Sequence, residues 1–204
     1  IHEKLYNGYC ISFISVTISD VLGILTQIDL SDVEIDDPSF KQPYMYAVSL
    51  LSKIFRMEPS ELFNQINGLY EISVTSDNWI IQHAFLIALT TLSSENKYNC
   101  IEDLYKRSTN FIVQCAQSEI DRLSESAVYT LEMIARNYNM YSNETGITQM
   151  LELIKILLNR NASICSRSLK LLQKIVSHKN APVDKLFDDL IEVSSAALGR
   201  KDFK

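Results

Sequence analysis

The chain contains one dense group of acidic side chains, and this group lies directly ahead of an aromatic residue. Phe40 follows the group, and Asn78 and Trp79 stand at the start of a later apolar stretch. Carboxylates attract Lys and Arg side chains, and aromatic rings stack on the alkyl stems of those side chains. We therefore expect these residues to bind a basic segment of another protein. The acidic residues, with no cation among them, are Asp29, Asp32, Glu34, Asp36 and Asp37.

Each of these groups also has a purely structural interpretation. The five carboxylates repel one another, which favours a solvated acidic loop over residues 29–39. Trp79 either faces a binding groove or packs between neighbouring helices. For Phe40, which has no polar handle, packing is the stronger of the two interpretations. The sequence leaves these alternatives open.

Residues for catalysis or metal binding do not come together in the sequence. His2, His83 and His178 are far apart, and none has a His or Cys at ligand spacing. His83 is expected to be a partly exposed helix histidine or, beside Trp79, a contact residue. No phosphate-binding or nucleophile-elbow motif is present, so we expect no enzyme, no cofactor and no metal site. Reduced, mostly buried thiols are expected at all four cysteines, Cys10, Cys100, Cys115 and Cys165.

Charge and hydropathy exclude two further classes of partner. The net charge is −6 and no basic stripe is present, so direct nucleic-acid binding is not expected. No apolar run reaches the roughly 20 residues that cross a bilayer, so no membrane insertion is expected. The polar residues 1–4 do not resemble a secretory signal. The chain begins without Met, which suggests a piece of a longer protein.

A repeated apolar pattern indicates the fold. A leucine, an apolar residue three positions after it and a residue four positions before it recur about every 40 residues, the period of HEAT and armadillo helix pairs. These three positions lie on one stripe of a helix. With 47% apolar residues, five Gly and four Pro, we predict an all-α protein, a right-handed α–α superhelix of HEAT/armadillo type. The copies are Phe85, Leu89 and Leu92; Ala47, Leu51 and Ile54; Ala127, Leu131 and Ile134; and Ser168, Leu172 and Ile175.

The predicted helix pairs form a single array over residues 1–204. The pairs span residues 9–57, 59–93, 99–138 and 147–178, with a partial pair over 182–204. The first helix of each pair is the outer one, and outer helices are predicted over 9–28, 62–74, 100–117, 147–158 and 183–198. The second helix of each pair is the inner one, and these second helices are predicted over 40–57, 79–93, 123–138 and 162–177. Residues 76–78 and Asn161 are predicted helix caps, and residues 139–146 a loop. Binding is expected on the concave face that the second helices line.

Between residues 21 and 92 the order of features resembles importin-β, the karyopherin family of nuclear import receptors built of HEAT repeats. The segments that carry this likeness are LGILTQIDL, DLSDVEIDDPSF, YAVSLLSKI and TSDNWIIQHAFLIAL. They place an acidic loop after an outer helix and an aromatic residue at the start of the next inner helix. Phe40 stands where the family usually has Trp, and Asn78-Trp79 where it has an Asp-Trp dipeptide. The Asp and Arg that recur in HEAT inner helices are mostly missing.

This resemblance implies a central segment of a carrier that shuttles between cytoplasm and nucleus. The concave face would bind basic nuclear-localisation or importin-β-binding segments, and the GTPase Ran would release them. Phe-Gly nucleoporins would contact the convex side. A second hypothesis is a HEAT or armadillo scaffold or adaptor subunit of a multiprotein complex, of the phosphatase-scaffold or vesicle-coat type. An enzyme is the third class, and it would need a catalytic constellation that these residues lack.

Overall fold

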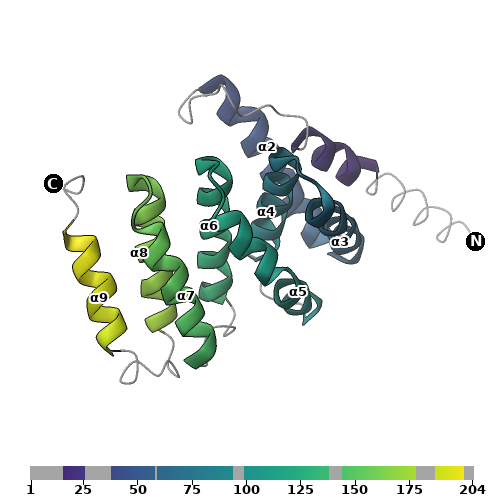
Figure 1. Cartoon of the computed structure of the whole chain (residues 1–204). Helices are drawn as coiled ribbons and strands as arrows, with labels where there is room; N and C mark the ends of the chain where they lie inside the picture. The colour runs from purple at the N-terminus through teal and green to yellow at the C-terminus, as the bar shows by residue number, and fades with distance from the viewer. Residues whose placement is uncertain are drawn as a thin grey trace, which may run out of the picture. The chain divides into compact units, whose positions relative to one another are not determined.

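The computed structural model describes residues 16–25, 38–57, 59–93, 99–137, 144–177 and 187–199. Every regular element within these ranges is an α-helix (Figure 1). A helix over residues 16–25 comes first. It is followed by α2 (Pro38–Met57), α3 (Pro59–Thr75), α4 (Trp79–Ser93), α5 (Asn99–Ala116), α6 (Asp121–Asn137), α7 (Glu144–Leu157), α8 (Ala162–Val176) and α9 (Phe187–Leu198).

The helices belong to two compact units, residues 1–97 and 98–204, and the division lies between two helix pairs. In the first unit α3 packs against α4, and α2 packs against both. In the second unit α5 packs against α6 and α7 against α8, while α6 also packs against α8 and α7 against α9 (Figure 1). Contacts within a pair and between equivalent helices of successive pairs are those of helix-pair repeats. The continuity of all pairs in one array stays a prediction.

The repeated apolar stripe forms the core of the helix pairs. All members of its four copies are buried, which confirms the register predicted from the sequence. The one polar member, Ser168, satisfies its hydroxyl group by donating to the Ile164 carbonyl oxygen at 2.8 Å. Full burial of a leucine side chain contributes roughly 1.5–3 kcal/mol. The fully buried leucines of the stripe are Leu51, Leu89, Leu92 and Leu131.

Some helices begin where the sequence predicts, and one begins earlier. α4 begins at Trp79 as predicted, and the Asn161 side chain caps α8 by accepting from the Ile164 N–H at 2.9 Å. α7 begins at Glu144, so the prediction of a loop through residue 146 is wrong at its end. Gly146 costs a helix up to about 1 kcal/mol. The early start completes a turn ahead of Ile147, the first buried residue of α7.

The buried stripe of α3 leaves one of its large apolar residues outside. Ile72 is 56% exposed, whereas Leu62, Ile66 and Leu69 are buried. Ser73 occupies the next buried position of the stripe because it follows Leu69 by four residues, and Ile72 lies about 100° around the helix from it. The Ser73 hydroxyl group donates to the Leu69 carbonyl oxygen at 2.7 Å, which satisfies this buried polar group.

Candidate protein-binding surfaces

The predicted acidic group lies outside the described residues. Phe40 is in the first turn of α2, which begins at Pro38, but its side chain is also outside the described set. The proposed grouping of carboxylates with an aromatic ring therefore stays a prediction. The acidic residues concerned are Asp29, Asp32, Glu34, Asp36 and Asp37.

Asn78 is exposed and caps α4. Its side-chain oxygen accepts from the Ile80 N–H at 3.0 Å, and its own N–H donates to the Ser76 hydroxyl oxygen at 3.1 Å. The Asn78 carbonyl oxygen also accepts from the Ile81 N–H at 3.1 Å. These bonds satisfy N–H groups that every helix start leaves without an intrahelical partner. This oxygen has a second lone pair and the side chain is exposed, so Asn78 can also accept a hydrogen bond from a partner protein.

Trp79 is half-buried and lies edge-on to His83. The two ring centroids are 6.2 Å apart with an interplanar angle of 70°. His83 is buried, so the prediction of a partly exposed histidine is wrong. The reason is packing density, because α4 buries residues around most of its circumference between α2 and α3. Trp79 thus packs on its own helix and still offers part of its ring to solvent.

Polar contacts join the second helices α6 and α8. The Arg160 guanidinium, just ahead of α8, donates to the Asp121 carboxylate at 2.8 Å. Glu125 on α6 accepts at one oxygen from two residues of α8, the Ser163 hydroxyl at 2.7 Å and the Arg167 Nε at 2.8 Å. Arg167 also lies over the Tyr129 ring, 4.7 Å from its centroid. The contacts fix α6 and α8 in register.

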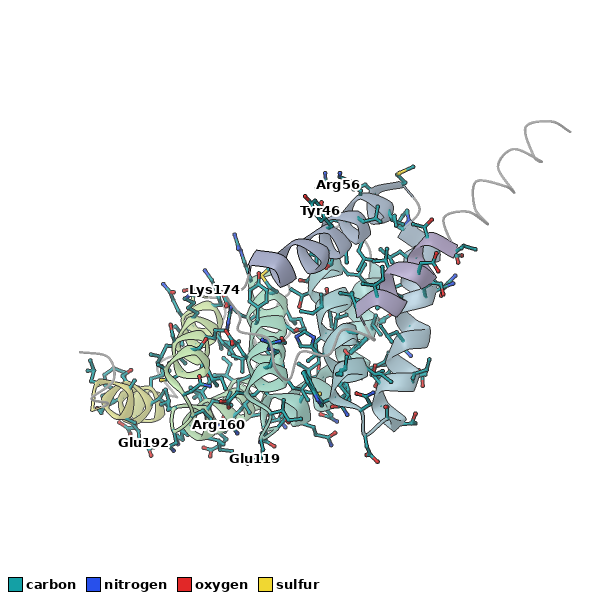
Figure 2. All side chains as sticks on the ribbon, turned by 90° about the horizontal axis from the view of Figure 1, so that it is seen from above. Tyr46, Arg56, Glu119, Arg160, Lys174 and Glu192 are labelled. Atoms are coloured by element: carbon teal, nitrogen blue, oxygen red, sulfur yellow. The ribbon has the colours of Figure 1, made fainter. Side chains whose placement is uncertain are left out.

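These contacts already use the acidic side chains at the start of α6. Arg160 and then Asn161 hydrogen-bond to Asp121, which lowers the pKa of its carboxyl group. Arg160 also pairs with Glu119 at 3.8 Å, and both residues are labelled in Figure 2. The positive charges on α8 itself are Arg167, Lys170 and Lys174, and α8 contains no acidic residue.

The sequence analysis missed these contacts, although the sequence contains a signal for them. Asp121 precedes Arg160 by 39 residues and Glu125 precedes Arg167 by 42, which is close to one repeat length. Acidic and basic residues one repeat apart are placed side by side when equivalent helices stack. Among the described residues, Asp121 and Glu125 supply the acidic side of these contacts and Arg160 and Arg167 the basic side.

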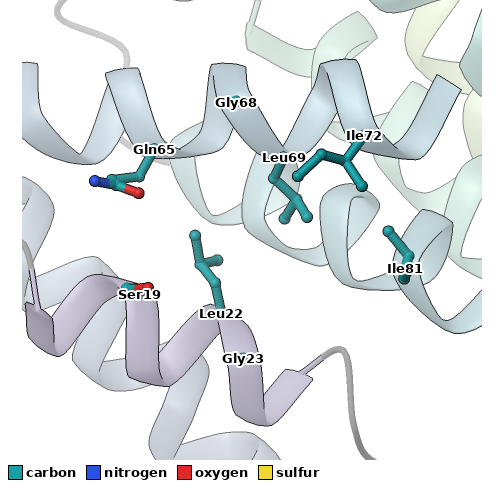
Figure 3. A pocket seen from close by; sticks show the side chains of 8 residues that line it. All are labelled: Ser19, Leu22, Gly23, Gln65, Gly68, Leu69, Ile72 and Ile81. Atoms are coloured by element: carbon teal, nitrogen blue, oxygen red, sulfur yellow. The ribbon is translucent and has the colours of Figure 1, made fainter. Parts of the chain in front are cut away.

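A cavity of about 380 Å³ opens in the first unit (Figure 3). Its floor is apolar, with Leu22 and Leu69 facing each other across the opening, and Gln65 supplies an amide at one side. A methyl group added at Gly23 or Gly68 would meet no atom within 4 Å, so both glycines leave the cavity open. Its lining residues are Ser19, Leu22, Gly23, Gln65, Gly68, Leu69, Ile72 and Ile81.

Reactive and metal-binding groups are not assembled in the part of the chain that the structure describes. Within it, no three His, Cys, Asp or Glu side chains are placed to hold a metal ion. Cys115 and Cys165 are buried and do not form a disulfide, and burial raises the pKa of Cys115 to about 12. Cys10 and Cys100 lie outside the described side chains. Of the described helices, none is long and apolar enough to span a membrane.

Comparison with known proteins gives one structural likeness. No family model matches the chain, and no curated protein matches it. A solved structure does match, with a TM-score of 0.78 and 14% sequence identity. Its title states that Kap95p binding induces the switch loops of RanGDP to adopt the GTP-bound conformation, with implications for nuclear import complex assembly. The match covers 93% of this chain and 22% of that chain.

At 14% sequence identity, this structural likeness shows the fold alone. The predicted class, an all-α protein of the HEAT/armadillo solenoid type, is confirmed. The chain spans only about a fifth of the length of the protein that it matches.

Proposed function

We propose that this chain is a protein-binding HEAT segment of a nuclear import receptor. The observation that carries the proposal is the likeness of its fold to a chain in the Kap95p–RanGDP structure. The order of acidic stretch, aromatic helix start and Asn78-Trp79 supports it independently. On this proposal the protein works in both cytoplasm and nucleus, and Ran is a partner of the full receptor.

The proposed cargo is a Lys/Arg-rich segment, either a nuclear-localisation sequence or an importin-β-binding segment. Its site would combine the five carboxylates of residues 29–37 with Phe40, Asn78 and Trp79. Exposed ion pairs contribute up to about 1 kcal/mol each, so no single carboxylate should dominate. The attraction acts over roughly 10 Å at 0.1 M salt and weakens as salt rises.

Titration of a fluorescent basic nuclear-localisation peptide tests the cargo proposal. Changing all five carboxylates to Asn or Gln should weaken binding by more than about tenfold at low salt. A matched control neutralises five exposed carboxylates elsewhere and should leave affinity nearly unchanged. Absence of binding at low salt, or equal losses in the two variants, would refute the proposed site. The control residues are Asp20, Glu71, Asp103, Glu119 and Asp188.

Phe-Gly segments of nucleoporins are the second proposed class of partner, and the cavity beside Gly68 is the proposed site for a phenyl ring. Leu22 and Leu69 offer apolar contact, and the open space at Gly68 admits a ring. Gly68→Met should fill the cavity and weaken binding of a Phe-Gly peptide. Gly68→Ala adds only one methyl group and should leave this binding intact. If both variants bind like wild type, the peptide does not use this cavity.

A HEAT scaffold or adaptor subunit is the alternative function. The fixed register of α6 on α8, held by Glu125 and Arg167, favours it because a scaffold needs rigid spacing. Affinity purification with and without Ran loaded with GTP separates the two functions. A receptor should release its partner when Ran-GTP is added, whereas a scaffold should retain stoichiometric subunits.

A further inference from the structure

The C-terminal halves of α6 and α8 carry more positive than negative charge. Arg136 is exposed in the last turn of α6, and on α8 Lys170 is exposed and Lys174 half-buried. Glu132 is the one acidic residue in these two half-helices, and α8 has none along its whole length. The chain as a whole, by contrast, has a net charge of −6. We refer to Arg136, Lys170 and Lys174 as the basic face, and Lys174 is labelled in Figure 2.

The register of α6 on α8 brings two of these cations together. The Tyr129 ring of α6 lies beneath the Arg167 guanidinium of α8. Arg136 stands seven residues after Tyr129, and Lys174 stands seven residues after Arg167, which is about two turns along each helix. Because α6 and α8 run in the same direction, Arg136 and Lys174 lie side by side.

The basic face has no carboxylate of its own to neutralise it. Among the described residues, no Asp or Glu forms an ion pair with Arg136, Lys170 or Lys174, whereas Arg160 and Arg167 are both paired. The helix dipole favours one cation in the last turn of each helix. It does not favour two cations side by side, because like charges repel. An anionic partner would relieve this repulsion.

The repeat shows on which side of α8 a further helix pair would stack. α6 is covered by α8 on the side that carries Val128 and Ala135, and both residues are fully buried. Their equivalents in α8, counted from the repeated leucine, are the apolar residues Leu169 and Val176. A following pair would therefore pack on Leu169 and Val176.

The basic face stays accessible in such a stack. Lys170 and Lys174 are the repeat equivalents of Tyr129 and Met133 of α6, which are only half-buried although α8 packs alongside them. Arg136 is exposed in the same setting. The openness of these positions thus belongs to the inner surface of the stacked second helices and does not depend on where the sequence begins or ends.

We infer that the basic face binds an acidic segment of a partner protein, one rich in Asp and Glu. Lys170 and Lys174 are about 6 Å apart along α8, and Arg136 lies beside Lys174. Carboxylates on alternate residues of an extended segment are about 7 Å apart, so such a segment can place one carboxylate at each cation. This partner has the opposite charge to the cargo proposed above, and its site is formed by the second unit alone.

The composition of the face favours a peptide over a nucleic acid. A nucleic acid is held by contacts to many phosphates, whereas the basic face has three cations and includes Glu132 among them. A peptide needs only as many carboxylates as there are cations, and it can place a neutral residue opposite Glu132. Contacts of this kind are surface ion pairs, so the affinity should fall as salt rises.

Two matched peptides of about ten residues test the inference by fluorescence anisotropy with the intact chain. The acidic peptide alternates Glu with Ser, and the neutral peptide has Gln in place of each Glu. At low salt only the acidic peptide should bind. The double variant Lys170→Glu, Lys174→Glu should weaken this binding at least about tenfold. The control Lys53→Glu, Lys106→Glu changes the net charge equally at exposed lysines elsewhere and should change the affinity less than about twofold.

A third variant should gain affinity, which loss of folding cannot imitate. Glu132→Gln removes the one carboxylate beside the basic face and should strengthen the acidic peptide about twofold to threefold. Circular dichroism checks that all variants are folded. The inference is overturned if the acidic peptide fails to bind, if the neutral peptide binds equally, or if the two double variants lose the same affinity. It is also overturned if a single-stranded RNA of equal charge binds more tightly than the acidic peptide and loses affinity in the Lys170→Glu, Lys174→Glu variant.

Discussion

Adjacent leucines on α2 should respond very differently to truncation. Leu51 is fully buried in the repeated stripe, whereas Leu50 is 38% exposed. A Leu→Ala change removes about three methylene equivalents, each worth roughly 0.8 kcal/mol when buried. For Leu51 the vacated space adds a cavity penalty, so the total loss should fall in the range of about 2.7–5.0 kcal/mol measured for buried leucines.

Leu50→Ala should lower the free energy of unfolding much less. Only about three-fifths of its surface is buried, so the transfer contribution falls to roughly 1.5 kcal/mol, and solvent fills the vacated space. The two substitutions are at adjacent positions of one helix. They therefore act on the same unit and change helix propensity in the same way. Leu171→Ala, at the repeat position equivalent to Leu50 but fully buried in α8, should cost as much as Leu51→Ala.

Urea unfolding with two signals measures these losses. Trp79 is the single tryptophan of the chain and lies in α4, so its fluorescence reports the first unit. Circular dichroism at a helix wavelength reports both units, and the two curves need not coincide in a repeat protein. Equal losses for Leu50→Ala and Leu51→Ala would refute the reasoning, because the two side chains would then be equally buried.

Three further predictions concern the cap, an ion pair and a thiol. Asn78→Ala should cost about 1 kcal/mol in the Trp79 unfolding curve because it removes the acceptor for the Ile80 N–H, whereas Asn78→Asp should keep most of the stability. Arg160 and Asn161 lower the pKa of Asp121 in the folded state. The carboxylate therefore makes its full contribution to stability above the pKa that it has in the unfolded chain, and this contribution is lost as the pH falls through the lower pKa of the folded state. The difference in melting temperature between wild type and Asp121→Asn should therefore shrink from about pH 6 to about pH 3, and a pH-independent difference would contradict it. Cys115, whose pKa burial raises to about 12, should resist a thiol reagent at neutral pH until the chain unfolds, and rapid labelling of native protein at this residue by mass mapping would contradict that expectation.

The repeat in the sequence was sufficient to predict the fold class and its core. The spacing of Leu51, Leu89, Leu131 and Leu172 is a periodic signal, and all four residues are buried as it requires. Helix ends were less predictable, because a start such as Glu144 depends on packing at Ile147 as well as on the glycine between them. Local composition alone favoured a loop there.

The candidate surfaces were harder to predict because they depend on which helices become neighbours. His83 was expected to be partly exposed from its place beside Trp79, yet α4 is enclosed by its neighbours and buries it. The Glu125–Arg167 contact joins residues 42 positions apart, which no local pattern reveals. The exposure of Leu50 also differs from the full burial of Leu171 at the equivalent repeat position, which the sequence pattern alone does not show.

The shared carboxylate oxygen of Glu125 has a consequence for how the second unit melts. One atom accepts from both Ser163 and Arg167, so loss of that carboxylate releases two donors of α8 together. In a linear array, the strength of nearest-neighbour coupling determines whether adjacent pairs lose structure in a single step or one after another. Glu125 is therefore a point at which the cooperativity of this unit can be changed while the apolar interior is left intact.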